Sequence, residues 1–477
     1  MIGGLQQTSS RLAVAAAAGL LMGGIALTPA SAADLGGDCC ADLEERVAEL
    51  EAITVRKGNR KVSLKLSGHV NRMLFWWDDG INDDVYSVDN GESETRFRLT
   101  GDASIMPGLS AGFKIEVEVV SAEGQNVDDR VDGAPNENSD GFINARKMEW
   151  NLKHDQLGKI SVGRLSSATD DLNQLNIAKN PLADADLDNF RDFHFVRPHG
   201  TLGCNGAACR TTLNLDAVAI NVDGPRIDGV RYDSPALFGL VLSAAWGEGD
   251  FADIAIRYKK EWNSIRLVAG IGYSWNTDET EVRTSELIDC PPPGLEQKTC
   301  IEERLDVERV VGSASIMHVP TGLYVYGAAN HDTFGNNHLR VSTFPAPVTG
   351  FNVPDANSWY LQSGIKRRLL APSLGATTLY GEFEQWNDYG IRRKSDRLGV
   401  DLDGGEITDT SVDMWGFGIV QDIDAAAMKL YAGLRVFESD IRVALPAGED
   451  EFCCQAPGKK IPTEDLYTVA FGGRIQF

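Results

Sequence analysis

Residues that most often carry catalysis are few in this chain of 477 residues, which holds only seven histidines. The sequence has no His-Glu-x-x-His motif, and therefore no zinc-protease helix. His69 lies two residues from Asn71, as in part of a hydrolase site. On a strand both side chains would point to the same face, where lining a water-filled space is the simpler role. We expect no enzyme and no cofactor.

The eight cysteines fall in four close pairs: Cys39 and Cys40, Cys204 and Cys209, Cys290 and Cys300, and Cys453 and Cys454. An even count in an exported chain favours disulfides. The second and third pairs lie in Gly- or Pro-rich stretches and could each close a local loop. The adjacent pairs would face other partners or stay reduced. Zinc is the alternative, but histidine is scarce and the spacings do not match zinc sites, so we expect no metal.

Composition sets broad limits on the class of protein. The chain has 69 acidic and 45 basic residues, a net charge of −24, which argues against a nucleic-acid partner. Hydrophobic residues make up 43%, enough for a core. A mean hydropathy of −0.20 argues against a bundle of membrane helices. It does not exclude a membrane β-barrel, whose strands alternate apolar and polar residues.

The amino-terminal part differs from the rest. Arg11, an apolar run from Leu12 to Leu27 and an Ala-x-Ala ending predict a signal peptide over 1–32. The run is too short for a membrane span. In 33–60, Leu43, Val47 and Leu50 recur at helical spacing among glutamates. They predict a short periplasmic helix or coiled-coil stalk, with an amphipathic helix lying on the protein as the alternative.

From residue 61 onward the apolar residues recur with a period of two. The alternation is clear in Thr95–Ile105, Phe113–Val119, Ile265–Trp275 and Tyr467–Phe477. Successive side chains of a strand point to opposite faces, so this pattern predicts half-buried strands.

The connections between these strands are of two kinds that alternate. Seven are tight, at 107–108, 155–158, 235–239, 263–264, 320–322, 371–375 and 424–426. Eight are longer or more polar, at 79–93, 122–139, 167–225, 247–250, 277–303, 332–355, 387–409 and 439–463. This predicts an all-β fold: a 16-stranded antiparallel transmembrane β-barrel over 61–477, with short periplasmic turns, long outer loops and the short amino-terminal helix.

The two faces of each strand have different expected surroundings. The apolar set should face lipid, and the charged set should line a wet lumen. Aromatic residues cluster near strand ends, as in interfacial girdles: Trp76, Trp77, Trp246, Trp262, Trp275, Trp359, Trp386, Trp415, Tyr467 and Phe477.

Several motifs resemble the alphaproteobacterial (Rhizobiales-type) general porins of the outer membrane. They are Lys57 to Lys61, Leu66 to Asn71, Trp76 to Gly80, Ser161 to Asp171 and a terminal strand ending in Phe477. The resemblance covers essentially the whole chain after residue 32. It implies a homotrimer in the outer membrane of a Gram-negative bacterium, in contact with its lipid. It also implies a water-filled channel through which small hydrophilic solutes and ions diffuse passively.

Porins of this family fold their third long loop into the barrel, which would make 167–225 the constriction loop. The resemblance implies an acidic loop carrying Asp170, Asp171, Asp184, Asp186 and Asp188. Opposite it would stand a basic wall: Arg96, Arg98, Lys114, Lys147 and Arg164. Opposed charges would set a transverse field that favours small polar solutes. Arg164 shares strand parity with Ile160 and Val162, so it needs a bulge or a strand end to reach the lumen.

Two further expectations concern the cell wall and ion preference. An exported chain beginning at Ala33 is similar to porins that are joined covalently to peptidoglycan, with a solvated amino-terminal tail as the alternative. A mainly structural tether between outer membrane and peptidoglycan is therefore the alternative function. The net charge suggests a weak preference for cations, although selectivity is set at the constriction.

Overall fold

The computed structural model describes residues 62–119, 121–122, 124, 127, 143–183, 185, 187, 189, 192–198, 210–219, 223–279, 301–341, 354–371, 373–389, 406–444 and 459–477. The predicted signal peptide, Ala33 and the predicted helix over 33–60 lie outside these residues. Within the described part, no helix is both long and apolar enough to cross a membrane.

The cysteines also lie outside the described residues. This holds for Cys204 and Cys209, and for Cys290 and Cys300, the two pairs for which a local disulfide is predicted. It holds equally for the two adjacent pairs, Cys39 with Cys40 and Cys453 with Cys454. Both disulfides therefore stay predictions.

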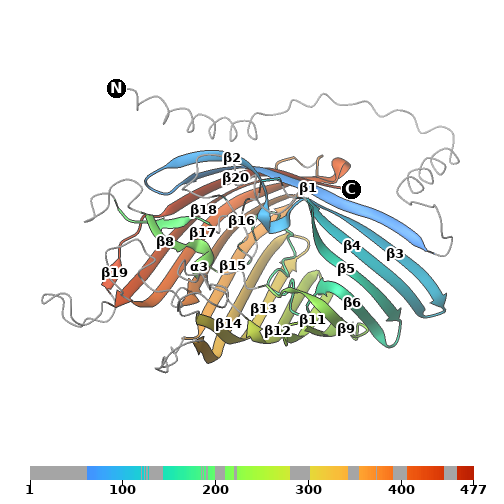
Figure 1. Ribbon diagram of the computed structural model, residues 1–477. Coiled ribbons are helices and arrows are strands. Elements are labelled where there is room, and N and C mark those ends of the chain that lie inside the picture. Colours follow the sequence, from blue (N-terminus) through green and yellow to red (C-terminus); the bar gives the residue numbers. More distant parts are fainter. Residues whose placement is uncertain are drawn as a thin grey trace, which may run out of the picture.

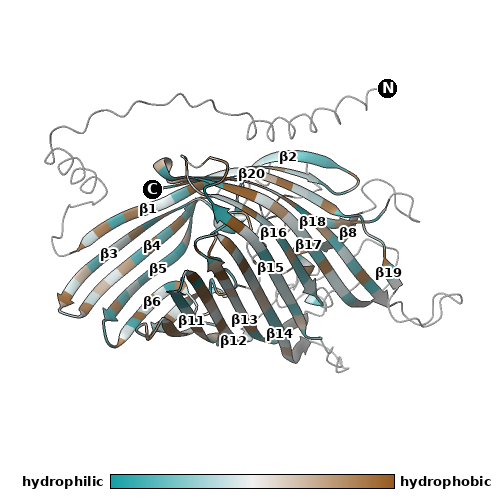
Figure 2. Cartoon of the chain, turned by 180° about the vertical axis from the view of Figure 1, so that it is seen from behind, coloured by the Kyte–Doolittle hydropathy of each residue, from teal (hydrophilic) through white to brown (hydrophobic). Residues whose placement is uncertain are grey.

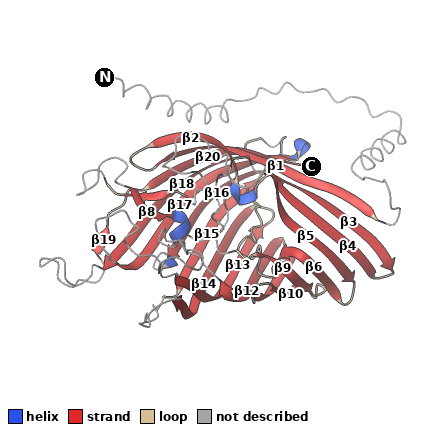
Figure 3. Ribbon diagram, viewed as in Figure 1, coloured by secondary structure: helices blue, strands red, loops and turns tan. Residues whose placement is uncertain are grey.

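Sixteen long strands form the wall, as predicted (Figures 1 and 3). They are β1 (Ser63–Asp78), β3 (Arg96–Met106), β4 (Leu109–Val119), β5 (Ile143–His154), β6 (Gly158–Ser166), β9 (Arg226–Asp233), β10 (Leu240–Gly247), β11 (Ala252–Trp262), β12 (Ile265–Glu279), β13 (Ile301–His318), β14 (Leu323–Val341), β15 (Ala356–Arg367), β16 (Thr377–Asn387), β17 (Glu406–Ile423), β18 (Met428–Ala444) and β20 (Leu466–Gln476). Each strand pairs antiparallel with the next, and β1 pairs with both β3 and β20. The barrel is closed, which leaves no open edge in lipid.

Shorter elements extend or fill this wall. β2 (Asp83–Asp89) pairs with the carboxyl-terminal half of β1, whereas β3 pairs with the amino-terminal half. The second wall strand is therefore broken at 90–95, where η1 (Gly91–Ser93) forms. β19 (Lys459–Ile461) pairs with the carboxyl-terminal end of β18. Between β6 and β9 lie the paired strands β7 (His194–Val196) and β8 (Arg210–Asn214), followed by α3 (Leu215–Val218).

The predicted connections agree with the observed strand order. All seven predicted tight turns join consecutive wall strands, and η6 (Asp424–Ala426) forms the last of them. The segment 167–225 fills the interval between β6 and β9. The prediction was incomplete at 79–93, because Tyr86 and Val88 belong to β2 rather than to a loop.

Hydrophobic and hydrophilic residues are interspersed along the strands of the wall (Figure 2). Their side chains alternate between its two faces. In β16, Thr378, Tyr380 and Glu382 are buried inside, whereas Leu379 is 40% exposed outside. The aromatic prediction was partly wrong. Trp246, Trp262, Trp359 and Trp415 are exposed on the outer face, but Trp77 and Trp386 are 2% and 1% exposed and lie in the interior cluster. Their parity on the strand, not their nearness to its end, decides which face they join.

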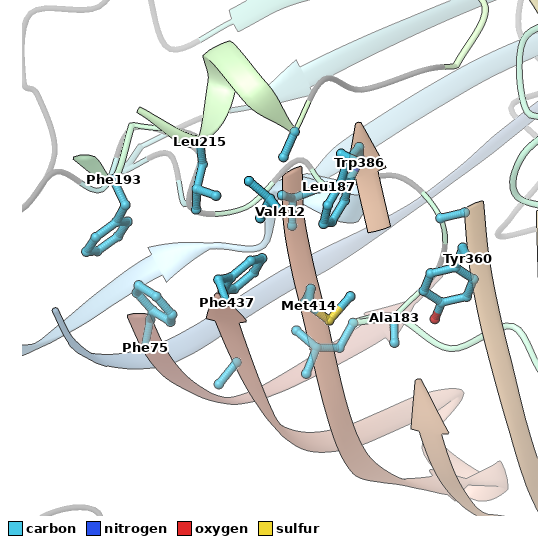
Figure 4. Packing of buried hydrophobic residues seen from close by; sticks show 14 of the residues in the cluster. Phe75, Ala183, Leu187, Phe193, Leu215, Tyr360, Trp386, Val412, Met414 and Phe437 are labelled. Atoms are coloured by element: carbon cyan, nitrogen blue, oxygen red, sulfur yellow. The ribbon is translucent and has the colours of Figure 1, made fainter. Parts of the chain in front are cut away.

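The interior contains a hydrophobic cluster built around the segment between β6 and β9. Phe193 packs edge-on against Phe75 and Trp77 of β1, with ring centroids 6.2 and 5.0 Å apart. Leu215 and Leu187 lie in the same cluster as Val412 of β17 and Phe437 of β18 (Figure 4). One side of the barrel is therefore filled by its own chain.

Candidate constriction site

The segment 167–225 leaves β6 and runs along the inner wall. Main-chain N–H groups of Ala168 and Thr169 donate to Asp253 of β11, at 3.0 and 2.7 Å. Ser313 of β13 donates to the Leu172 carbonyl at 2.5 Å. Tyr326 of β14 donates to the Asn173 carbonyl. The start of the segment is thus fixed to three successive parts of the wall.

Further contacts continue around the barrel. The Gln362 amide of β15 donates to the Ala183 carbonyl at 3.1 Å. The Lys366 and Lys429 ammonium groups donate to the carbonyls of Ala178 and Lys179, at 2.9 and 2.8 Å. Asn90, in the break between β2 and β3, donates to the Pro181 carbonyl at 2.9 Å. The described residues from 168 to 183 therefore lie inside the barrel, mainly against the inner wall of β11, β13, β14, β15 and β18.

Small wall residues make room for it. A Cβ atom on Gly272 of β12 would lie 2.6 Å from Leu172 Cδ1 and 2.7 Å from Thr169 Cγ2. A Cβ on Gly270 would lie 2.7 Å from Leu172 Cδ2. On β18, a Cβ on Gly433 would lie 2.7 Å from Leu182 Cδ2. These glycines form a trough that seats the loop without a clash.

Opposite the loop, β3, β4 and β5 carry the predicted basic residues. Arg96 and Arg98 of β3 both approach Glu116 of β4, at 3.6 and 2.5 Å. Lys114 lies on the inward face of β4 with Glu116, because the two differ by two positions. The structure thus brings Arg96, Arg98 and Lys114 together on one wall.

Arg146 of β5 joins this wall, although strand parity places it with the outward-facing Met148. A register shift opposite Glu116 and Val117 inserts one extra residue into β5 and turns Arg146 inward. Its guanidinium lies 2.7 Å from Glu94 and 2.5 Å from Glu118. No feature of the sequence marks this bulge, and the prediction missed Arg146 for that reason.

Lys147 connects the basic wall to the beginning of the loop. Its ammonium group donates to Ser166 and lies 3.6 Å from an Asp170 carboxylate oxygen. Carboxylate oxygens of Asp170, Asp171 and Asp223 lie within 4.8 Å of one another. Burial and the charges of Asp170 and Asp171 raise the pKa of Asp223 well above its ordinary value. Three acids therefore share this part of the loop with Lys147.

Arg164 does not belong to the basic wall, and its predicted role was wrong. It lies on the outward face of β6 with Ile160 and pairs with Asp228 of β9 at 3.0 Å. The side chains of both are nearly half exposed. The strand has no bulge at this point, so parity holds and the guanidinium stays outside. Asp184, Asp186 and Asp188 lie outside the described residues.

The chain matches a known protein family. A family model described as Gram-negative porin matches residues 13–441. This chain is a Gram-negative porin. It is a diffusion channel of the outer membrane. No curated protein sequence matches the chain.

Solved structures resemble this porin in fold. The anion-selective porin from Comamonas acidovorans is 15% identical, with a TM-score of 0.51 over 87% of this chain and 100% of that one. The outer membrane channel DcaP of Acinetobacter baumannii is 13% identical, with a TM-score of 0.45 over 88% and 99%. OmpT of Vibrio cholerae, folded in vitro, is 12% identical, with a TM-score of 0.45 over the same shares.

One serine of the porin matches a catalytic spacing. Gly108, Ser110 and Gly112 have the Gly-x-Ser-x-Gly spacing of a nucleophile elbow. They form the tight turn after β3 and the start of β4, so a strand follows where the elbow requires a helix. Ser110 therefore lacks the setting that would activate it.

Proposed function

We propose that the narrowest part of this porin lies between the loop 167–225 and the wall of β3, β4 and β5. The observation that carries the proposal is the path of the described loop residues 168–183, which are held by hydrogen bonds to β11, β13, β14, β15 and β18. Arg96, Arg98, Lys114, Arg146 and Lys147 line the wall of β3, β4 and β5, which we call the open wall. Asp170 and Asp171 belong to the loop that faces it. Solutes would pass between the two, in a field set by their charges.

Reconstitution into a planar bilayer tests this function. Purified protein should give stepwise increases in conductance, and replacing Arg98 by Trp should make each step smaller because the side chain protrudes into the open side. Replacing outward-facing Arg164 by Trp should leave the step unchanged. Absence of steps from folded protein would reject the channel, and equal effects of both variants would reject the placement of the constriction.

We propose a homotrimer, on the basis of a polar site on the outer face. Arg72 lies between Val70 and Leu74 of β1, both of which are more than 40% exposed. Its guanidinium contacts Asp89 at 3.1 Å, and Asp89 is almost fully buried. A charged pair is costly against lipid and is better accommodated against protein. Chemical cross-linking followed by native gel electrophoresis should give a trimer, and a monomer alone would contradict it.

A tether to the cell wall is the second candidate function, and it can coexist with the channel. We propose that the chain belongs to the alphaproteobacterial porins, which its motifs resemble. On the basis of that resemblance we also propose a covalent link from Ala33 to peptidoglycan. Mass spectrometry of lysozyme-digested cell walls should find an amino-terminal peptide that carries a muropeptide. Its complete absence would reject the link. We propose no catalytic activity.

A further inference from the structure

The open wall of the lumen has a marked excess of positive charge. Strands β1, β3, β4, β5 and β6 point eight cations inward, among the described residues: Lys65, Arg96, Arg98, Lys114, Arg146, Lys147, Lys153 and Lys159. The same strands point four acids inward: Asp102, Glu116, Glu118 and Glu149. Twice as many cations as acids therefore point inward on this side.

Burial increases this difference at the surface. Glu116 and Glu118 are 1% and 8% exposed, since Arg98 and Arg146 cover them. The Arg98 side chain is 40% exposed and that of Lys159 is 38% exposed. The side chains of Arg96, Arg146 and Lys147 are also largely buried, at 14%, 10% and 13% exposed. The most exposed inward charged groups on these strands are therefore Lys65, Arg98, Lys153 and Lys159, against Asp102.

The excess continues around the barrel near the periplasmic turns. Among the described residues, each of nine strands places one inward cation within four residues of its turn end: Lys65, Lys153, Lys159, Arg231, Lys259, Arg266, Lys366, Lys429 and Arg474. The inward acids at this level are Asp102, Asp233, Glu261 and Asp422. Lys366 and Lys429 both share Asp422, at 3.5 and 3.6 Å, so one carboxylate serves two cations there.

We propose that this lumen selects small anions over cations. The proposal rests on the proposed function and names its substrate class. It opposes the cation preference that the net charge suggests. The net charge belongs to the whole chain, whereas a permeating ion responds to the groups lining the lumen, where low-dielectric walls focus the field. On the loop side, Asp170 is 6% exposed and lies against Lys147, whereas Asp171 is exposed.

The reversal potential in a potassium chloride gradient tests the sign. The wild-type channel should pass chloride over potassium by about twofold or more. A triple variant, Lys65→Glu, Lys153→Glu and Lys159→Glu, should reverse the preference. Arg164→Gln, on the same strand as Lys159 but facing outward, should leave the ratio unchanged. The neutral triple variant with Gln at the same positions should fall between the two and guards against misfolding of the Glu variant.

The outcomes separate the two claims. Stepwise conductance with a cation-selective wild type would overturn the anion proposal and leave the diffusion channel intact. An anion-selective wild type whose ratio neither triple variant moves would overturn the assignment to these lysines. Absence of conductance steps would overturn the proposed function itself. A shift in the order wild type, Gln variant, Glu variant would support the proposal.

Discussion

The Arg435 guanidinium of β18 donates to both carboxylate oxygens of Glu382 on β16, from Nε at 3.0 Å and from Nη2 at 3.4 Å. Its Nη1 lies 3.2 Å from Glu92 in η1. The Tyr360 hydroxyl donates to the same Glu382 at 2.7 Å. Arg435 is 3% exposed, so the three charges form a buried network that joins η1 to β16 and β18.

Replacing Arg435 by Met should lower the free energy of unfolding by about 3–5 kcal/mol, because two buried carboxylates lose their counter-charge. Arg368 offers a matched control, since it pairs with Asp424 at 2.7 Å with both side chains more than half exposed. Its replacement by Met should cost about 0–1 kcal/mol. Urea unfolding of the barrel in lipid vesicles measures both. Equal losses would show that burial of the Arg435 network contributes nothing.

Filling the glycine trough should displace the loop. We expect Gly272→Val to lower stability by about 1–3 kcal/mol through overpacking. It should also reduce single-channel conductance, since Leu172 and Thr169 must move toward the open wall. Gly381 is the control, because its added Cβ would meet nothing closer than a main-chain oxygen at 3.8 Å. Gly381→Val should leave the conductance as it is. An unchanged conductance for Gly272→Val would mean that the trough does not set the loop position.

The acids at the base of the loop should make stability depend on pH. The pKa of Asp223 is raised in the folded chain, so the folded chain binds this proton more tightly than the unfolded chain does. Stability should therefore fall as pH rises from the unfolded value of about 3.9 through the raised folded value. Lys147, Arg226 and Arg257 face the same acids and oppose this effect.

Asp223→Asn should remove that part of the pH dependence and raise stability at neutral pH. Thermal unfolding at several pH values, compared between wild type and variant, measures the change. The isosteric amide keeps the shape of the side chain. A variant that loses stability at neutral pH would show that the Asp223 charge is stabilising.

Arg146 and Arg164 should respond in opposite ways to substitution. Arg146→Met leaves Glu94 and Glu118 buried without their partner, and we expect a loss of about 3–5 kcal/mol. Arg164→Met breaks only a half-exposed pair, worth about 0–1 kcal/mol. Unfolding in urea again provides the measurement. A large effect at Arg164 would indicate that its outer-face pair is buried in an assembly.

Most of the barrel follows from the sequence because a strand has a strict period of two. That period, with the turns, predicts the sixteen strands and places Arg96, Arg98 and Lys114 inside. It fails where the register changes, as at Arg146, since a bulge depends on the partner strand. The loop path is equally hidden, because it depends on glycines and polar groups contributed by β11 to β18. Arg164 shows the reverse case, in which strand parity held and the family analogy did not.

The loop also contacts strands from both ends of the chain. Phe193 packs on Phe75 and Trp77 of β1, and Leu182 fits the space left by Gly433 of β18. The loop is thus a common packing partner of β1 and β18. Closing the ring requires β1 to find β20, across nearly the full length of the chain. The loop contacts both sides of that closure, so it links β1 to β18 through packing as well as through the strand pairing.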